Sequence, residues 1–428
     1  MTVAQPFLRL KLRRRSQAEP LYGQFVEERF GQYGQAAHED WIWIHAVSLG
    51  ETKTAGILLK SLRETFPSMK LLLTHGTATG REEGQKLLQE GDVQVWQPWD
   101  TAEAVCRFLK AFQPKIGLIM ETEVWPNLVH CASKFNVPLV LVNARMSEKS
   151  MNQALRWPSL MCTAFHGLSA VLAQTQDDAR RLSNLGARVN GIYGNLKFDA
   201  QPDEPQMVLA QHWRSSMQGP VLMLASSREG EEALWLEAWQ GYCQKHPQAQ
   251  INCLIVPRHP QRVAEVETLF QTKGWQVSRR SSWGADGPRT AIEHNPSEAR
   301  TILLGDSLGE MTLYYSFANV ALLGGSFAKL GGQNLIEAAA CACPVVMGPH
   351  TFNFAEVAQA AENSGAALRV ANMSEAIEVA CELALNAEHQ SALASKAKQF
   401  AQAHGGATQR TALAVLHCLT QIKDSTAR

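Results

Sequence analysis

Two acidic side chains follow apolar runs in the first half of the sequence, where they could take part in proton transfer. Glu51 ends the segment HAVSLGE, which also holds Ser48 and Gly50, and Glu121 lies in METEVWPN. In open α/β sheets, ligands bind in the crevice beyond the carboxyl ends of the strands. A carboxylate there can act as a general base. A glutamate at a helix start can equally do no more than complement the helix dipole, so both interpretations of Glu51 stay open.

Two basic residues could meet an anionic ligand. Lys197 lies in GNLKFD near the expected domain boundary, from which it could reach into an interdomain cleft, although a lone lysine is commonly an ordinary surface residue. The stretch Pro257-Arg258-His259 ends an apolar run, where an arginine is suited to bind a carboxylate or phosphate.

Glycine-rich turns in the second half suggest a nucleotide. Gly309, Glu310 and Met311 lie in a turn between a predicted strand and a predicted helix. A later turn, GGQNLIE, contains Asn334, Leu335, Ile336 and Glu337. Glycines permit a close approach of the backbone, and free N–H groups at a helix start bind anions. Glu337 lies about one helical turn beyond Asn334, so it could accept hydrogen bonds from ribose hydroxyls. Each turn alone could be purely structural, but together they favour a nucleotide site.

The elements that must position these residues alternate between apolar runs and helical patterns. The runs are continuously apolar, as strands covered on both faces of a parallel sheet require. Their alternation with helices predicts a doubly wound α/β sheet. Strands are predicted at 41–47, 70–75, 93–98, 115–120, 138–144, 168–174, 221–227, 251–257, 301–306, 320–326 and 344–348, and helices include 102–112 and 177–186.

The chain is predicted to form two domains of similar size. A short acidic stretch with two prolines at 199–206 is a plausible linker. We therefore expect an N-terminal domain at 1–203, with a basic leader at 1–40, and a C-terminal domain at 204–428. Two such halves suggest a ligand between them at the carboxyl ends of their strands.

Composition excludes several classes of function. The 428 residues hold 40 Lys and Arg against 40 Asp and Glu, so the chain lacks the excess of cations typical of a nucleic-acid-binding protein.

No Walker A loop is present, and no G-x-G-x-x-G follows a predicted strand. Cys341 and Cys343 lack a second ligand pair, so packing explains them better than zinc does. Nine cysteines, an odd and sparse number, favour a reducing compartment. No apolar stretch reaches the roughly 18–20 residues that span a bilayer.

The leader is basic, with Arg9, Lys11 and three consecutive arginines at 13–15 and no acidic residue among the first fifteen. It could be a solvated segment, or it could contact anionic lipid headgroups.

Taken in order, these motifs resemble those of the 3-deoxy-D-manno-octulosonic acid (Kdo) transferases. The matching segments are HAVSLGE, METEVWPN, VNARMS, GNLKFD, VPRHP, LGDSLGEM, GGSF with GGQNLIEAA, and MGPHTFNF. The resemblance implies the GT-B fold, in which two Rossmann-like doubly wound domains face each other across a cleft and the last helices pack back on the N-terminal domain. It also implies transfer of Kdo from CMP-Kdo to a lipid A precursor in lipopolysaccharide biosynthesis, with inversion at the anomeric carbon.

The resemblance further implies roles for particular residues. Glu51 resembles the general base, with Ser48 and Gly50 beside it, and Glu121 and Lys197 resemble positions that stabilise the transition state. CMP-binding elements are implied at Pro257 through His259, Gly309 through Met311, and Asn334 through Glu337. The leaving group carries a single phosphate, so we expect no metal or other cofactor.

Members of this family usually begin with a hydrophobic anchor. Here ERFGQY (28–33) and a basic stretch are present without such an anchor. We therefore expect peripheral contact with an anionic membrane surface, at the cytoplasmic face of the bacterial inner membrane, or a start drawn too far downstream. The alternative functions are a GT-B transferase or epimerase that uses a uridine nucleotide, and a noncatalytic nucleotide-binding protein.

Overall fold

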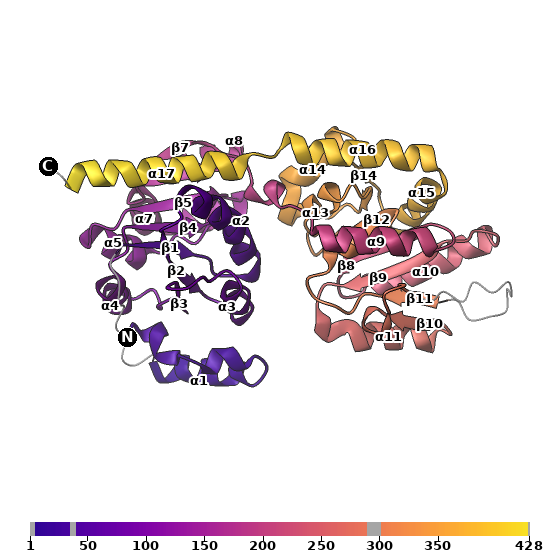
Figure 1. Cartoon of the computed structure of the whole chain (residues 1–428), viewed down its shortest axis with the longest axis horizontal. Coiled ribbons are helices and arrows are strands. Elements are labelled where there is room, and N and C mark those ends of the chain that lie inside the picture. The colour runs from indigo at the N-terminus through magenta and orange to yellow at the C-terminus, as the bar shows by residue number, and fades with distance from the viewer. Residues whose placement is uncertain (1–4, 35–39, 289–300, 427–428) are drawn as a thin grey trace. The chain divides into compact units, whose positions relative to one another are not determined.

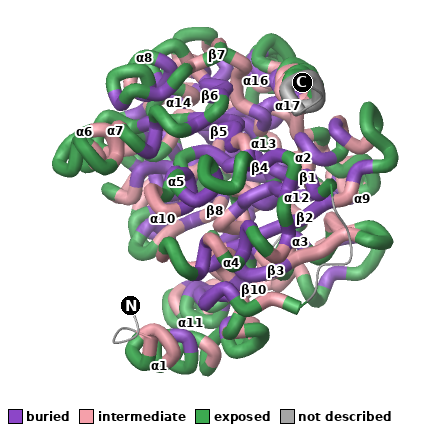
Figure 2. Tube along the Cα trace, turned by 90° about the vertical axis from the view of Figure 1, so that its left-hand side faces the viewer, coloured by how far each residue is buried: buried purple, intermediate pink, exposed green. Residues whose placement is uncertain are grey.

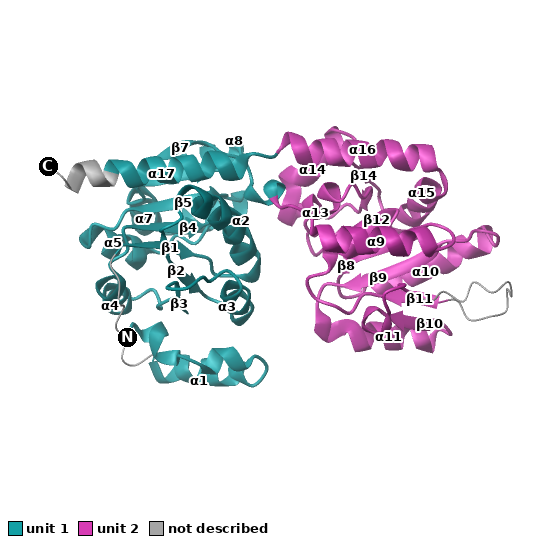
Figure 3. Ribbon diagram, in the orientation of Figure 1, with its two compact units in different colours: residues 1–199, 405–428 teal, residues 200–404 magenta. Residues whose placement is uncertain are grey.

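The computed structural model describes residues 5–34, 40–288 and 301–426, which form two compact α/β units. Unit 1 comprises residues 1–199 and 405–428, and unit 2 comprises residues 200–404 (Figure 3). The chain therefore leaves unit 1 after Asp199 and returns to it at Gly405. No helix in the described part of the chain combines the length and the apolar character needed to cross a bilayer.

Unit 1 is built on a seven-stranded parallel sheet in the order β3-β2-β1-β4-β5-β6-β7 (Figure 1). The strands are β1 (Trp41–His45), β2 (Lys70–His75), β3 (Val93–Trp96), β4 (Ile116–Met120), β5 (Leu139–Ala144), β6 (Ala170–Ala173) and β7 (Val189–Ile192). The helices and 3-10 turns are α1 (Gln5–Ser16), η1 (Pro20–Gly23), η2 (Val26–Phe30), α2 (Leu49–Thr65), α3 (Ala78–Gln85), α4 (Ala102–Phe112), α5 (Pro126–Lys134), α6 (Glu148–Ala154), α7 (Pro158–His166), α8 (Gln176–Asn184), η3 (Leu196–Asp199) and α17 (Ala407–Thr426).

The central strands of unit 1 are buried on both faces, as their continuous apolar runs predict. Successive residues of β1 enter different cores. Trp41 and Trp43 pack with residues of α4 and α5 on one face, whereas Ile42 and Ile44 pack with residues of α2 and α17 on the other. This alternation follows from the two-residue period of a strand.

Unit 2 contains a second seven-stranded parallel sheet, in the order β10-β11-β9-β8-β12-β13-β14. The strands are β8 (Val221–Ser227), β9 (Asn252–Pro257), β10 (Gln276–Arg279), β11 (Thr301–Leu304), β12 (Val320–Leu323), β13 (Val345–Met347) and β14 (Ala367–Arg369). The helices and 3-10 turns are α9 (Glu204–Ser216), α10 (Glu231–Lys245), η4 (Pro260–Arg262), α11 (Val263–Thr272), η5 (Arg280–Ser282), α12 (Met311–Phe317), α13 (Ile336–Ala340), η6 (Phe352–Phe354), α14 (Ala355–Asn363), α15 (Met373–Leu385) and α16 (Ala387–Ala403).

Three strands, β7, β10 and β14, were not among the predicted ones. All three lie at the ends of their sheets and are only partly buried. An end strand has a neighbour on one side only, so it does not need the continuous apolar run by which a central strand is recognised.

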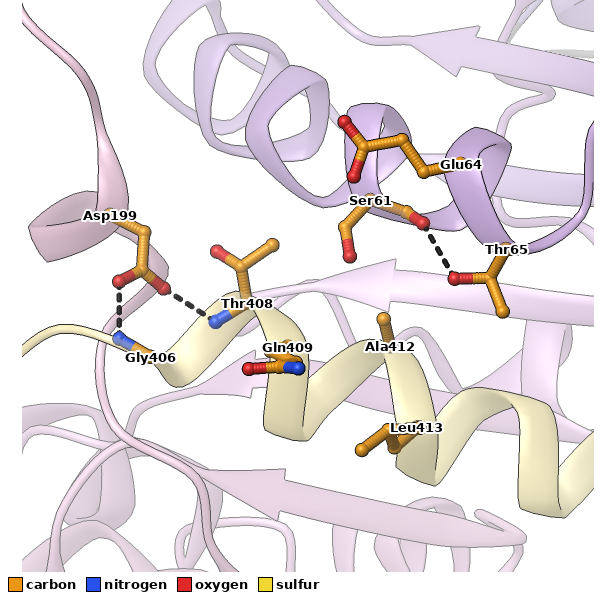
Figure 4. A pocket seen from close by; sticks show the side chains of 9 residues that line it. All are labelled: Ser61, Glu64, Thr65, Asp199, Gly406, Thr408, Gln409, Ala412 and Leu413. Carbon is orange, nitrogen blue, oxygen red and sulfur yellow. Dashed lines mark hydrogen bonds between the residues drawn. The ribbon is translucent and has the colours of Figure 1, made fainter.

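The returning helix α17 is held on unit 1 by the residue at which the chain leaves that unit. The Asp199 carboxylate accepts hydrogen bonds from the backbone N–H groups of Gly406 and Thr408, at the start of α17 (Figure 4). A carboxylate in this place satisfies N–H groups that have no partner within the helix. The outgoing and returning segments of the chain are therefore tied together at one point.

Candidate functional site

In unit 1, the candidate residues gather where the strand order reverses. β1 lies between β2 and β4, so the connections after β1 and β4 leave in opposite directions and open a crevice at the carboxyl ends. Ser48, Gly50 and Glu51 lie at the start of α2, directly after β1. Glu121 directly follows β4, and Lys197 enters from η3.

The Glu51 side chain is fixed by reciprocal hydrogen bonds at the start of α2. Its backbone N–H donates to Ser48 Oγ at 3.3 Å, and Ser48 Oγ in turn donates to Glu51 Oε1 at 2.8 Å. The backbone N–H of Val47 donates to Oε2 at 2.8 Å. This arrangement is close to a capping box, so Glu51 does stabilise the helix start. The same bonds orient the carboxylate.

The proton affinity of Glu51 goes beyond what a helix-capping role needs. Burial raises the pKa of this carboxyl group to about 7, and the negative charges of Glu123 and Glu121 act in the same direction. The hydrogen bonds from Val47 and Ser48 oppose the shift without cancelling it. A carboxylate with a pKa near the working pH is suited to accept a proton during a reaction. Burial also raises the pKa of Glu123, with a further contribution from Glu121.

Glu121 lies between two cations. Its side chain is buried, and its backbone has a left-handed φ of 55°, rare for a residue other than glycine. Lys197 Nζ donates to Glu121 Oε1 at 2.8 Å, and Arg145 Nε lies 3.4 Å from Oε2. One carboxylate thus faces two positive charges, so this trio carries a net charge of +1. Strained backbone of this kind is concentrated at functional sites.

Asn143 positions the turn that carries Lys197, and it was absent from the predicted site. This asparagine is buried near the end of β5 and also has a left-handed φ, of 51°. Its Oδ1 accepts a hydrogen bond from the backbone N–H of Leu196 at 3.0 Å, and its backbone carbonyl accepts one from Gln174 Nε2 at 2.8 Å. Both residues belong to the motif VNARMS, in which Asn143 lies at the end of the predicted strand 138–144 and Arg145 directly follows it, a signal that could have identified them.

In unit 2, the strand order reverses between β8 and β12. Pro257 ends β9 beside Ser227 of β8, and the backbone N–H of Arg258 donates to the Ser227 carbonyl at 3.0 Å. The Arg258 side chain is exposed. Burial lowers the pKa of His259, and the positive charges of Arg258 and Arg228 lower it further. Cations thus gather at the ends of β8 and β9. Arg228 is not among the predicted site residues, although it directly follows a predicted strand.

Of the acidic residues beside this cationic corner, Glu229 is exposed and pairs with Arg228 at 3.0 Å, whereas the next two hold the fold. Glu231 is fully buried and accepts hydrogen bonds from the backbone N–H groups of Gly325, Phe327 and Ala328, at 2.6, 3.0 and 3.2 Å. It also accepts one from the backbone N–H of Arg228 at 2.9 Å. The turns after β8 and β12 are therefore joined through one carboxylate. Its neighbour Glu232 binds the Arg262 guanidinium through both oxygens, at 2.8 and 3.0 Å.

The other predicted nucleotide-binding residues lie along the same edge of the unit 2 sheet. Gly309 has a left-handed φ of 81° in the turn after β11, and Met311 begins α12. Between them, Glu310 is paired with Arg280 at 2.9 Å, so its carboxylate already has a cationic partner.

The last predicted segment, Asn334 to Glu337, lies after β12. The Asn334 side chain accepts a hydrogen bond from the backbone N–H of Ile336 at 3.1 Å. Leu335 and Ile336 are buried, whereas Glu337 is exposed. Gly331, with a φ of 90°, allows this loop to pass so close to Asn353 that a Cβ atom would lie 2.3 Å from its Nδ2. Within the described residues, no group of three or more His, Cys, Asp or Glu side chains is placed to hold a metal ion.

Comparison with known proteins identifies the family to which this chain is similar. The family model described as 3-deoxy-D-manno-octulosonic-acid transferase (kdotransferase) matches residues 24–200. A 3-deoxy-D-manno-octulosonic acid transferase of Bordetella pertussis is 43% identical over 397 residues, covering 90% of this chain and 90% of its own. The protein of the same name from Haemophilus influenzae is 31% identical over 420 residues, covering 96% and 95% of the two chains.

Solved structures with similar folds share far less sequence. A UDP-GlcNAc 2-epimerase from Neisseria meningitidis aligns with a TM-score of 0.56 at 14% identity, over 89% of this chain and all of its own. MurG of Acinetobacter baumannii aligns with a TM-score of 0.50 at 14% identity, over 90% of this chain and all of its own. Together with the two parallel sheets, these likenesses confirm the predicted GT-B fold class.

Proposed function

This chain belongs to the 3-deoxy-D-manno-octulosonic acid transferases, and from that premise we propose that it moves Kdo from CMP-Kdo to a hydroxyl group of a lipid A precursor. The observation that carries this proposal is Glu51, an oriented carboxylate with a pKa raised to about 7. A sugar hydroxyl is a poor nucleophile at neutral pH. A positioned base that takes its proton accelerates the attack by about 10²–10⁴-fold.

The proposed reaction is a single displacement. The acceptor hydroxyl gives its proton to Glu51 while its oxygen bonds to the anomeric carbon of Kdo. The bond from that carbon to the CMP phosphate breaks, and CMP leaves with the electron pair. One displacement inverts the anomeric configuration and requires no protein nucleophile.

The charges of both units support this assignment. The Kdo moiety carries a carboxylate, which suits the net positive trio of Glu121, Lys197 and Arg145. The phosphate of CMP suits the cationic corner of Arg258 and Arg228, because charge developing on the leaving group is stabilised by fixed cations. With one phosphate to neutralise, these side chains can take the place of a divalent metal. We therefore propose that unit 2 holds CMP and that unit 1 supplies the base.

The proposed acceptor, lipid IVA, is amphiphilic, so the enzyme must work at a membrane. In α1, basic residues gather without an acidic residue, including exposed arginines at 13–15 in its last turn. Such a helix is suited to an anionic leaflet, since each basic side chain near the surface contributes about 1 kcal/mol of binding. We place the reaction at the cytoplasmic face of the inner membrane, in the biosynthesis of the lipopolysaccharide core.

Mass spectrometry of lipid IVA after incubation with CMP-Kdo tests the proposal directly. We expect a mass increase of one or more Kdo residues, and no product when UDP-sugars replace CMP-Kdo. Transfer from a UDP-sugar alone would instead support another GT-B transferase. CMP binding in calorimetry without any product would indicate a noncatalytic nucleotide-binding protein.

A further inference from the structure

Two cysteines of unit 1 face each other across two helices and take no part in the proposed reaction. Cys106 lies in α4 and Cys131 in α5, and their Sγ atoms are 2.9 Å apart. All nine cysteines are free thiols, so this is a contact between two thiols. Cys341 and Cys343 are far closer to each other in the sequence, yet the thiol of each approaches a backbone carbonyl instead. The pairing of Cys106 with Cys131 is therefore a product of the fold.

The two thiols are aligned by a short chain of hydrogen bonds. The Cys106 thiol donates to Cys131 Sγ, and the Cys131 thiol donates to the Ala102 carbonyl at 3.6 Å. A sulfur atom that accepts a hydrogen bond directs a lone pair at the donor, so a lone pair of Cys131 Sγ points at Cys106 Sγ. This is the orientation from which one sulfur attacks the other when a disulfide forms.

The surrounding packing keeps the two sulfur atoms together. α4 and α5 share one hydrophobic core, to which Cys131 belongs and against which Cys106 packs. Just before α4, the Asp100 carboxylate accepts hydrogen bonds from the backbone N–H groups of Asn127 and Leu128 in the first turn of α5, at 3.2 and 2.8 Å. In Figure 2 each of the two helices combines buried and exposed residues, as helices that cover a sheet do. The cysteines are thus held in contact without a covalent bond.

The two thiols differ in exposure, which sets the order of their oxidation. Cys106 is half-buried, whereas Cys131 is only 1% exposed. Burial raises the pKa of the Cys131 thiol, and contact with Cys106 raises it further. Oxidation of a cysteine follows its exposure and its thiolate character. A peroxide that arrives from solvent therefore meets Cys106 first, while the Cys131 thiol stays protonated.

From these observations we infer that Cys106 and Cys131 form a peroxide-responsive pair that closes to a reversible disulfide. In the first step, Cys106 Sγ attacks one oxygen of hydrogen peroxide and the O–O bond breaks. The thiol becomes a sulfenic acid, and its proton leaves with the other oxygen as water. In the second step, Cys131 Sγ attacks Cys106 Sγ and the S–O bond breaks, so that the departing hydroxide takes the Cys131 proton as a second water. Small thiols of a reducing compartment restore both cysteines by thiol–disulfide exchange.

The disulfide has two consequences for unit 1. It stops the oxidation of Cys106 at a reversible stage, because a sulfenic acid that condenses with a thiol does not proceed to the irreversible sulfinic acid. It also joins α5 covalently to α4, directly after the loop that carries Glu121 and Glu123. The inference does not depend on the proposed function, since neither step involves a sugar or a nucleotide.

Peptide mapping of the folded full chain tests the inference. Trypsin places Cys106 in the peptide 87–107 and Cys131 in the peptide 116–134, and neither peptide holds another cysteine. After treatment with hydrogen peroxide and alkylation of the remaining thiols, we expect these peptides as one linked species, lighter than their sum by the two hydrogen atoms lost. Dithiothreitol should separate them. Only separate peptides after peroxide, whether alkylated or carrying sulfinic acid, would overturn the inference.

Variants and melting curves show whether the fold builds this link. C106S should lose the linked species, whereas the matched control C418S, which removes a half-buried thiol of α17, should keep it. The Tm of the linked wild type should exceed that of the reduced protein by about 5 °C or more, because a disulfide constrains the unfolded chain. A linked protein that melts below the reduced one would show that the bond forms only by distorting α4 and α5, which would equally overturn the inference.

Discussion

The two sheets share a scaffold but differ in the state of the carboxylates at their switch points. In unit 1, Glu51 and Glu123 have raised pKa values, because they are partly buried and close to further negative charge. In unit 2, the Glu231 carboxylate accepts hydrogen bonds from backbone N–H groups, and the Glu232 carboxylate is paired with the guanidinium of Arg262. The first arrangement suits proton transfer, and the second suits a rigid binding surface. Sheets of similar topology can therefore suit different tasks, proton transfer in unit 1 and ligand binding in unit 2.

The order of the strands explains how this division arises. Both units contain the order 3-2-1-4-5-6 familiar from dinucleotide-binding folds. Unit 1 extends it with β7 at one end, and unit 2 instead inserts β11 between β10 and β9. Both scaffolds open a crevice at a reversal of strand order. What differs is the turn after the first strand of each unit. In unit 1 it leaves a glutamate at the crevice, and in unit 2 it directs a glutamate inward to hold the glycine-rich turn after β12.

The largest expected effect comes from Glu51→Gln, which removes the proton acceptor but keeps the shape of the side chain. We expect kcat for Kdo transfer to fall by about 10²–10⁴-fold. Affinity for CMP, measured by calorimetry, should stay nearly unchanged, because binding is assigned to unit 2.

The matched control is Glu64→Gln, an exposed glutamate near the other end of α2. It should turn over like the wild type. If Glu51→Gln kept more than about a tenth of wild-type turnover, Glu51 could not be the base. The proposed contrast between proton transfer in unit 1 and ligand binding in unit 2 would then fail.

The next largest effect should be structural and lie in unit 2. Glu231→Ala leaves four backbone N–H groups without their acceptor, that of Gly325 in a buried hydrogen bond and the other three in partly buried ones. We expect the free energy of unfolding of unit 2 to fall by about 3 kcal/mol, since each unsatisfied buried group costs about 1–3 kcal/mol and the turns can relax in part.

Denaturant titration followed by tryptophan fluorescence measures this change. Glu237→Ala, at an exposed position of the same helix, should shift the transition by no more than about 0.5 kcal/mol. An equally small effect of Glu231→Ala would mean that this carboxylate does not hold the two turns together.

A smaller but diagnostic effect concerns pH. Glu51 must be deprotonated to accept a proton, and its pKa is about 7. The transfer rate should therefore rise with pH to a plateau above 8, and at pH 6 it should be about a tenth of that plateau. A rate already at its plateau at pH 5.5 would contradict the raised pKa.

The same shift predicts how stability depends on pH. The pKa of Glu51 in the folded protein lies above its ordinary value of 4.5, so the folded state holds this proton more tightly than the unfolded state does. The resulting stabilisation is present below pH 4.5 and is lost as the pH rises through about 7. Glu51→Gln lacks this dependence, so its Tm relative to the wild type should be higher at pH 8 than at pH 5.

How far the sequence predicts this molecule depends on the range of the interactions involved. Strands 70–75 and 221–227 could be predicted to the residue, because burial on both faces demands continuous apolar runs. End strands such as β7 lack that pattern. Glu51 could be chosen as a candidate from its place after a strand, but its pKa could not be predicted. The shift depends on burial in the folded unit and, to a lesser extent, on the charges of Glu123 and Glu121, about 70 positions away.

The same limit explains the positioning residues that the sequence did not reveal. Asn143 bonds to Leu196, and Glu231 bonds to residues 325–328, in each case across a long stretch of chain. Only the folded sheet brings these partners together.

An effect of similar size, on CMP binding and not on turnover, is expected in unit 2 for Arg258→Ala. The Arg258 side chain is exposed at the end of β9, near Arg228, so its loss should not disturb the fold. One charge-assisted hydrogen bond to a phosphate is worth about 1.5 kcal/mol, which corresponds to about tenfold weaker CMP binding in calorimetry. Lys273→Ala removes an exposed cation after α11 and should bind CMP like the wild type. Unchanged affinity of Arg258→Ala would remove this residue from the CMP site. A loss of CMP affinity in Glu51→Gln as large as that in Arg258→Ala would show that the two units do not divide chemistry and recognition between them.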